Sequence, residues 1–122
     1  MTSNRVSWIE YKGEKILYAD YSNATPDEII STAKESVSIS CAQEKKSILQ
    51  LVDVSNANYD LKSWQTVRQG AKETVPYSKA SAVLGVEGAK KYLLTVTKMV
   101  SKRNIKAFDN INDAKEWLVS QK

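Results

Sequence analysis

The sequence predicts an α/β fold in which helices flank a mostly parallel sheet of four to five strands. Strand-like and helix-like patterns alternate along most of the chain, which is typical of sheets built from parallel strands. Residues 47–55 form a near-continuous apolar run, the pattern of a strand buried on both faces. The 122 residues suit one compact core. We therefore expect residues 1–122 to form a single domain, with an antiparallel strand at the N-terminal edge of the sheet and about four flanking helices.

The N-terminal segment predicts a β-hairpin. Residues 6–11 and 16–21 are rich in aromatic and aliphatic side chains, which favour strands. Residues 12–14 between them have the composition of a turn. We expect the first of these strands to lie antiparallel at the edge of the sheet.

A helix is predicted to start after Thr25 and to run to about Gln43. Thr25 is a capping residue, Pro26 suits the first helical position, and Glu28 stands where a capping box needs an acid. Apolar residues then recur at helical spacing. Cys41 falls on this apolar stripe, so we expect a buried structural thiol rather than a reactive one.

A second strand–helix–strand unit follows. After the strand at 47–55, Asp60 is expected to cap a helix that Pro76 ends, and residues 81–86 form another short apolar strand. The expected apolar face of this helix comprises Leu61, Trp64, Val67, Ala71 and Val75.

The C-terminal part predicts two more helices around one strand. A third helix is expected to begin at Gly88, and residues 105–108 form the last strand. Asp109 or Asn110 is expected to cap a final helix. Its predicted core residues are Ala114, Trp117 and Leu118. The tryptophans Trp8, Trp64 and Trp117 are expected to fill the core or its rim, and Trp64 is the candidate wall of a ligand site.

Composition excludes much chemistry. The chain has no histidine and one cysteine, so no serine–histidine or cysteine–histidine pair, histidine-ligated zinc or internal disulfide can form. The carboxylates Asp20, Asp53 and Asp109 follow no known ligand spacing. We therefore expect no enzyme activity, no cofactor and no metal. No apolar run is long enough to span a bilayer and no signal peptide is evident, so a cytoplasmic protein is expected.

The net charge of +4 hides an asymmetry along the chain. Residues 1–61 carry a formal charge of −3 and residues 62–122 carry +7. Four cations gather on one arc of the expected third helix: Lys90, Lys91, Lys98 and Lys102. One interpretation is a surface for anionic membranes or an acidic partner, and the other is an ordinary solvated helix face. Nucleic acid is not expected, because no aromatic platform interleaves with these lysines and the other half of the chain is acidic.

Polar residues follow the strand at 47–55, where α/β proteins bind ligands beyond the carboxyl ends of parallel strands. Asp53, Ser55 and Asn58, together with Ser63 and Trp64 of the next helix, are the candidate ligand- or partner-binding residues. The alternative interpretation is that these residue types serve turns and helix caps. Residues 85–88 lack the lysine and serine or threonine of a phosphate loop, so close strand-to-helix packing is expected there.

Three segments carry a resemblance to a known family. Residues 47–55 resemble the buried strand of STAS domains that ends in Asp-Val/Leu-Ser, and residues 80–91 are similar to the family's strand, glycine turn and basic helix. Residues 108–118 resemble its closing Phe-Asp and Ala-x-x-Trp-Leu helix. The chain thus resembles the STAS/SEC14-like group, the SpoIIAA-like domains related to anti-sigma-factor antagonists.

This resemblance implies a sheet of four or five strands with helices around it and no established enzyme activity. It also implies a phosphorylatable serine in an Asp-Ser-Ser-Gly turn, and Ser63 stands near the equivalent place without that pattern. The SEC14 side implies lipid or other apolar ligands.

The sequence thus predicts a non-enzymatic regulatory or binding module that engages a protein partner or a small apolar ligand at the strand-end region. The alternative is a peripheral domain that associates with a lipid or membrane surface through the basic third helix. A homodimer is left open.

Overall fold

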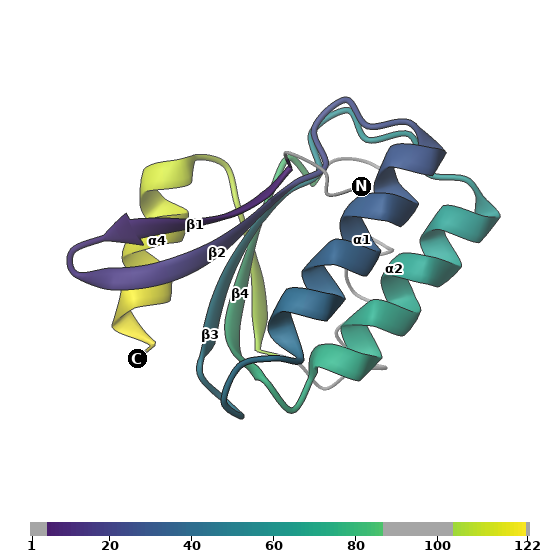
Figure 1. Cartoon of the computed structure of the whole chain (residues 1–122). Helices are drawn as coiled ribbons and strands as arrows, with labels where there is room; N and C mark the ends of the chain where they lie inside the picture. Colours follow the sequence, from purple (N-terminus) through teal and green to yellow (C-terminus); the bar gives the residue numbers. More distant parts are fainter. Residues whose placement is uncertain (1–4, 87–103, 122) are drawn as a thin grey trace.

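The computed structural model describes residues 5–86 and 104–121 (Figure 1). In chain order, its elements are β1 (Val6–Tyr11), β2 (Glu14–Asp20), α1 (Pro26–Ser40), β3 (Ile48–Asp53), α2 (Leu61–Thr74), β4 (Ser78–Leu84), β5 (Ile105–Phe108) and α4 (Ile111–Ser120). The helix predicted from Gly88 lies outside the described residues. The other predicted elements are present, with boundaries shifted by a few residues.

The five strands form one sheet in the order β1-β2-β3-β4-β5. β1 pairs antiparallel with β2, and the remaining neighbours are parallel. Asp20, Asp53 and Leu84 pair side by side, so the carboxyl ends of β2, β3 and β4 meet at one edge. The α/β class and the antiparallel N-terminal edge strand are therefore confirmed.

Helices cover both faces of the sheet: α1 and α2 lie on one side and α4 on the other (Figure 1). Alternate strand residues point to opposite faces. Leu49 and Leu51 of β3 therefore pack in the cluster that holds Leu118 of α4, whereas Val52 packs in the cluster that holds Ile29 of α1. The apolar run of β3 is buried on both faces because each face has its own helical layer.

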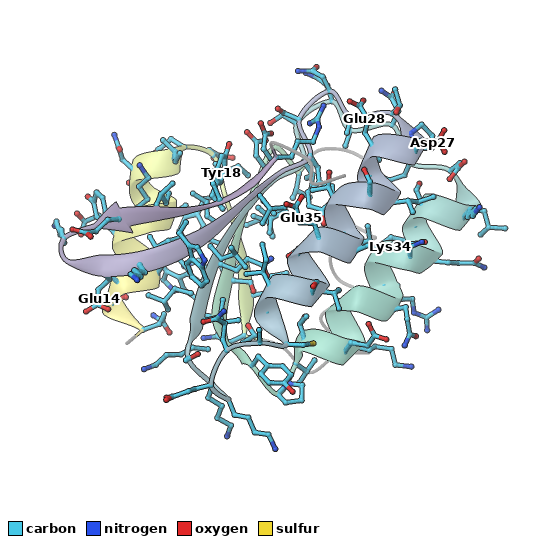
Figure 2. All side chains as sticks on the ribbon, in the orientation of Figure 1. Glu14, Tyr18, Asp27, Glu28, Lys34 and Glu35 are labelled. Atoms are coloured by element: carbon cyan, nitrogen blue, oxygen red, sulfur yellow. The ribbon has the colours of Figure 1, made fainter. Side chains whose placement is uncertain are left out.

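The start of α1 follows from its sequence. The Glu28 N–H donates to Thr25 Oγ1 over 3.2 Å, and the Thr25 N–H donates to Glu28 Oε1 over 2.9 Å, which is the predicted capping box. Asp27 and Glu28 lie at the N-terminal end of the helix, where its dipole favours acids (Figure 2). Arg5, at the entry to β1, forms an ion pair with Glu28 over 3.2 Å.

Small residues let α2 approach α1. The buried residues of α2 are Ser63, Gly70 and Thr74. A β-carbon added at Gly70 would lie 2.9 Å from Cγ2 of Val37 on α1. Gly70 thus permits the close approach to α1, and Trp64 and Val67 of the same helix line the space above the sheet.

Two side-chain predictions are corrected. Cys41 is exposed, because α1 ends at Ser40 and Cys41 is its C-cap, beyond the part of the helix that covers the sheet. Leu61 is 71% exposed because it is the first residue of α2, whereas Trp64 and Val67 of the same predicted stripe line the space above the sheet. Trp8 is 42% exposed on the edge strand, so of the two predicted places, core or rim, it occupies the rim.

The cap and the buried residues predicted for the C-terminal helix are present in α4. Asn110 is the cap, and its Oδ1 accepts a hydrogen bond from the Asp113 N–H over 2.9 Å. Ala114 and Leu118 are fully buried. The ring of Trp117 packs against that of Phe108, with centroids 5.6 Å apart. Of the helices that the structure describes, none has the length and apolar character needed to cross a bilayer.

Candidate ligand-binding site

Backbone hydrogen bonds join the loops at the carboxyl edge of the sheet. The Tyr21 N–H donates to the Asp53 carbonyl over 2.7 Å, and the Asn23 N–H donates to the Ser55 carbonyl over 2.9 Å. The Val54 N–H donates to the Leu84 carbonyl over 2.9 Å. The segments that follow β2, β3 and β4 are therefore held together as one edge.

Gly85 closes this edge. Its φ of +79° is in the left-handed region, which favours glycine. A β-carbon there would lie 2.2 Å from Ser55 Oγ and 2.6 Å from its backbone nitrogen. The glycine thus permits close packing on the loop after β3, and the helix against which packing was predicted lies outside the described residues.

The predicted polar residues Asp53, Ser55 and Asn58 lie together in this edge. Asp53 Oδ1 accepts a hydrogen bond from the Ser55 N–H over 2.9 Å. The Asn58 N–H donates to the Ala24 carbonyl over 3.0 Å, and its side-chain amide lies 3.4 Å from the same oxygen. These groups shape the loops, and Asn58 is exposed. Their role in binding a ligand or partner stays a prediction.

Ser63 is fully buried in the cap of α2. The Asp60 N–H donates to Ser63 Oγ over 2.8 Å, and the Ser63 N–H donates to Asp60 Oδ1 over 2.8 Å. The Ser63 N–H, helped by the side-chain hydrogen bond, holds the pKa of the Asp60 carboxyl below its usual value. In this arrangement the hydroxyl is not open to a kinase, which agrees with the absence of an Asp-Ser-Ser-Gly turn.

Next to the strand-end edge, a mainly apolar cavity of about 120 Å³ separates α1 and α2 from strands β3, β4 and β5. The described residues that line it are Tyr21, Ala33, Ser36, Val37, Gln50, Val52, Val54, Tyr59, Trp64, Val67, Gly70, Ala71, Thr74, Ser81, Val83, Val86 and Ile105. None of these side chains carries a formal charge at neutral pH.

Tyr59 and Trp64 form an aromatic wall at the end of the cavity nearest the strand-end loops. Their ring centroids are 6.5 Å apart and their planes meet at 86°, an edge-to-face contact. Burial raises the pKa of the Tyr59 hydroxyl to about 12. The wall is therefore neutral, and Trp64 stands where a wall of a ligand site was predicted.

Sequence reasoning missed the polar end of the cavity. The side-chain amide of Gln50, in the middle of β3, donates to Ser36 Oγ of α1 over 3.1 Å. Ser81 is the neighbour of Gln50 across the β3–β4 pair. The available signal was one amide residue inside the apolar run at 47–55, but its partner lies in another element.

Two further expectations concern ionic sites. Lys90, Lys91, Lys98 and Lys102 lie outside the described residues, so the basic surface and the membrane interpretation stay predictions from the sequence. Within residues 5–86 and 104–121, no group of three or more histidine, cysteine, aspartate or glutamate side chains is placed to hold a metal ion.

The fold itself has a relative among solved structures. The sequence matches no known family profile. It also matches no curated protein sequence. The structure resembles the crystal structure of an uncharacterized protein of the DUF3478 family with a SpoIIAA-like fold, from Shewanella loihica PV-4. The TM-score is 0.72 at 16% sequence identity, over 97% of this chain and 98% of that one. The chain therefore has a SpoIIAA-like fold, as its sequence resemblance implies.

Proposed function

We propose that this protein is a non-enzymatic binding module of the regulatory kind, which takes a small apolar ligand in the cavity between α1, α2 and strands β3–β5. The observation that carries the proposal is the cavity with its aromatic wall of Tyr59 and Trp64. Protein pockets for small molecules are lined mainly by apolar and aromatic side chains with a few polar groups, and this lining has that character.

The size of the cavity limits the ligand. An apolar protein cavity of roughly 150 Å³ accommodates benzene. At about 120 Å³, the cavity suits a molecule on the scale of one aromatic ring or a short branched chain. A whole phospholipid is far too large for it.

The ionisable groups among the described lining residues are the hydroxyls of Tyr21 and Tyr59. Their chemistry favours binding over catalysis. Because burial raises the pKa of Tyr59 to about 12, its hydroxyl stays protonated at neutral pH and is a poor general base. The chain also has no histidine, the commonest proton-transfer residue of enzymes.

The loop after β3 links the cavity to the surface. Val54 and Tyr59 line the cavity, whereas Asn56 and Asn58 of the same loop are exposed. A ligand in contact with Val54 and Tyr59 would favour one arrangement of this loop, and a protein partner at Asn56 and Asn58 would sense it. This arrangement accounts for both a ligand and a partner at the strand-end region.

Tryptophan indole signals in a proton–nitrogen correlation spectrum test the proposal. Toluene is the probe, and we expect it to shift the Trp64 signal in a saturable way. Trp8 on the edge strand and Trp117 on the α4 face serve as internal controls and should not move. Ala71→Leu, which fills part of the cavity, should weaken the Trp64 response.

Two results would contradict the proposal. One is a Trp64 signal that does not move up to the solubility limit of toluene. The other is a shift of equal size at Trp8, Trp64 and Trp117, which would indicate nonspecific partitioning onto the surface.

A further inference from the structure

One end of the cavity is polar, and this polarity comes from the central strand. Gln50 stands two residues before Val52, so both side chains point to the same face of β3, and Val54, just after the strand, lines the same cavity. One N–H of the Gln50 amide donates to Ser36 Oγ over 3.1 Å. Among the described residues, Ser36 Oγ is the one hydrogen-bond partner of this half-buried amide.

Serine hydroxyls flank this amide. Ser36 is 6% exposed on α1, and Ser81, opposite Gln50 on β4, is 1% exposed. Hydrogen-bonding groups that are removed from bulk water cost free energy unless they find a partner. A cavity with such an end therefore favours an occupant that brings a matching polar group to Gln50.

The rest of the cavity is apolar and therefore favours a ligand whose remaining part is apolar. Val52 and Val83 of the sheet face Val67 of α2 across it. No charged side chain is among the described residues of the lining, so a buried carboxylate or ammonium would find no counter-charge there. The described lining therefore favours a neutral occupant.

We propose that the ligand is a small neutral amphiphile, about the size of one aromatic ring, with a single hydroxyl group that hydrogen-bonds to Gln50. The inference rests on the proposed function and specifies the ligand class and its orientation. A hydroxyl both donates and accepts, so it can form one hydrogen bond with either the carbonyl oxygen or the second N–H of the Gln50 amide. The apolar body then lies toward Val52, Val67 and the wall at Trp64.

Three probes of similar size separate the contributions: toluene has no polar group, phenol has one hydroxyl, and benzoate is charged. The Trp64 indole signal reports the dissociation constant of each. In Gln50→Leu, the ratio of the phenol constant to the toluene constant should rise roughly three- to tenfold, because one hydrogen bond is lost. Ser36→Ala should raise the ratio less. Benzoate at neutral pH should not shift Trp64.

Gln69→Leu is the matched control, because Gln69 is exposed on α2 and does not line this cavity. It should leave the ratio unchanged. The inference about the hydroxyl group would be overturned if the ratio of the phenol to the toluene dissociation constant stayed constant in both Gln50→Leu and Ser36→Ala. If toluene still shifted Trp64 in that case, the proposed function would stand. Benzoate binding as tight as phenol would overturn it too. If neither toluene nor phenol shifts Trp64, both proposals fall.

Discussion

Gly85 lies against Ser55 so closely that a β-carbon at Gly85 would come within 2.6 Å of the Ser55 backbone nitrogen. This contact joins the end of β4 to the loop after β3, and the Val54–Leu84 hydrogen bond lies beside it. The same loop supplies Tyr59 to the cavity wall. The geometry of the proposed binding site therefore depends on a glycine at its edge.

Gly85→Ala should destabilise the protein by more than the roughly 1–2 kcal/mol that a left-handed φ costs a residue with a side chain. The surplus comes from the clash with Ser55, because backbone atoms there cannot move out of the way easily. Gly13→Ala is the control: its φ is +81° and nothing lies within 4 Å of the added carbon. Urea denaturation compares the two, and equal losses of unfolding free energy would show that the Ser55 contact is not tight.

Gly70→Ala should have an effect that depends on Val37. Alanine is better than glycine inside a helix by about 1 kcal/mol, but its methyl group would lie 2.9 Å from Val37 Cγ2. In the wild-type background we expect this gain to be lost or reversed. In a Val37→Ala background the gain should reappear as added stability. Denaturant unfolding of the four proteins measures the coupling, and additive effects would contradict the close α1–α2 approach.

Thr32→Val should stabilise the protein by about 1–2 kcal/mol. Thr32 is fully buried in α1, and its hydroxyl oxygen has no hydrogen-bond partner among the described residues. Valine keeps the shape and removes the unsatisfied group. Thr74→Val is the matched control, because the Thr74 hydroxyl donates to the Gly70 carbonyl over 2.9 Å. Thermal unfolding should give effects of opposite sign, and a loss of stability in both variants would refute the prediction.

Tyr59 should make stability depend on alkaline pH. Its pKa is about 12 in the folded protein because of burial, and near 10 in an unfolded chain. The folded state therefore keeps the proton longer, so the stabilisation is complete below about pH 10 and is lost as the pH rises towards 12. In Tyr59→Phe this part of the loss should vanish. Unfolding free energies measured across that interval test this, and identical pH profiles would contradict the burial of the hydroxyl.

Local sequence signals were sufficient for the framework of the fold. The residues of the capping pairs Thr25–Glu28 and Asp60–Ser63 stand three positions apart, and the strand at 47–55 is a single apolar run. The shared edge at Asp53 follows once these strands pack in parallel, whereas the order of the strands was not predicted. Side-chain burial and contacts that depend on how two helices or strands pack together were not predicted.

Leu61 illustrates the limit on burial. Its spacing places it on the same apolar stripe as Trp64, but it is the first residue of α2 and remains exposed, because spacing alone does not show how far the neighbouring elements cover a helix. The candidate site shows the same division. Trp64 was foreseen as a ligand wall because it follows a strand-end loop, whereas the pairing of Gln50 with Ser36 joins residues on different elements.

Xenon tests most directly whether the cavity admits a ligand, since it enters empty apolar cavities of proteins. Crystals of the protein under xenon pressure should show anomalous density between Val52 of β3 and Val67 of α2, and Ala71→Leu crystals should show weaker density there. Crystals in which side chains of this chain fill that space and xenon is absent from it would contradict the binding function proposed for this SpoIIAA-like fold.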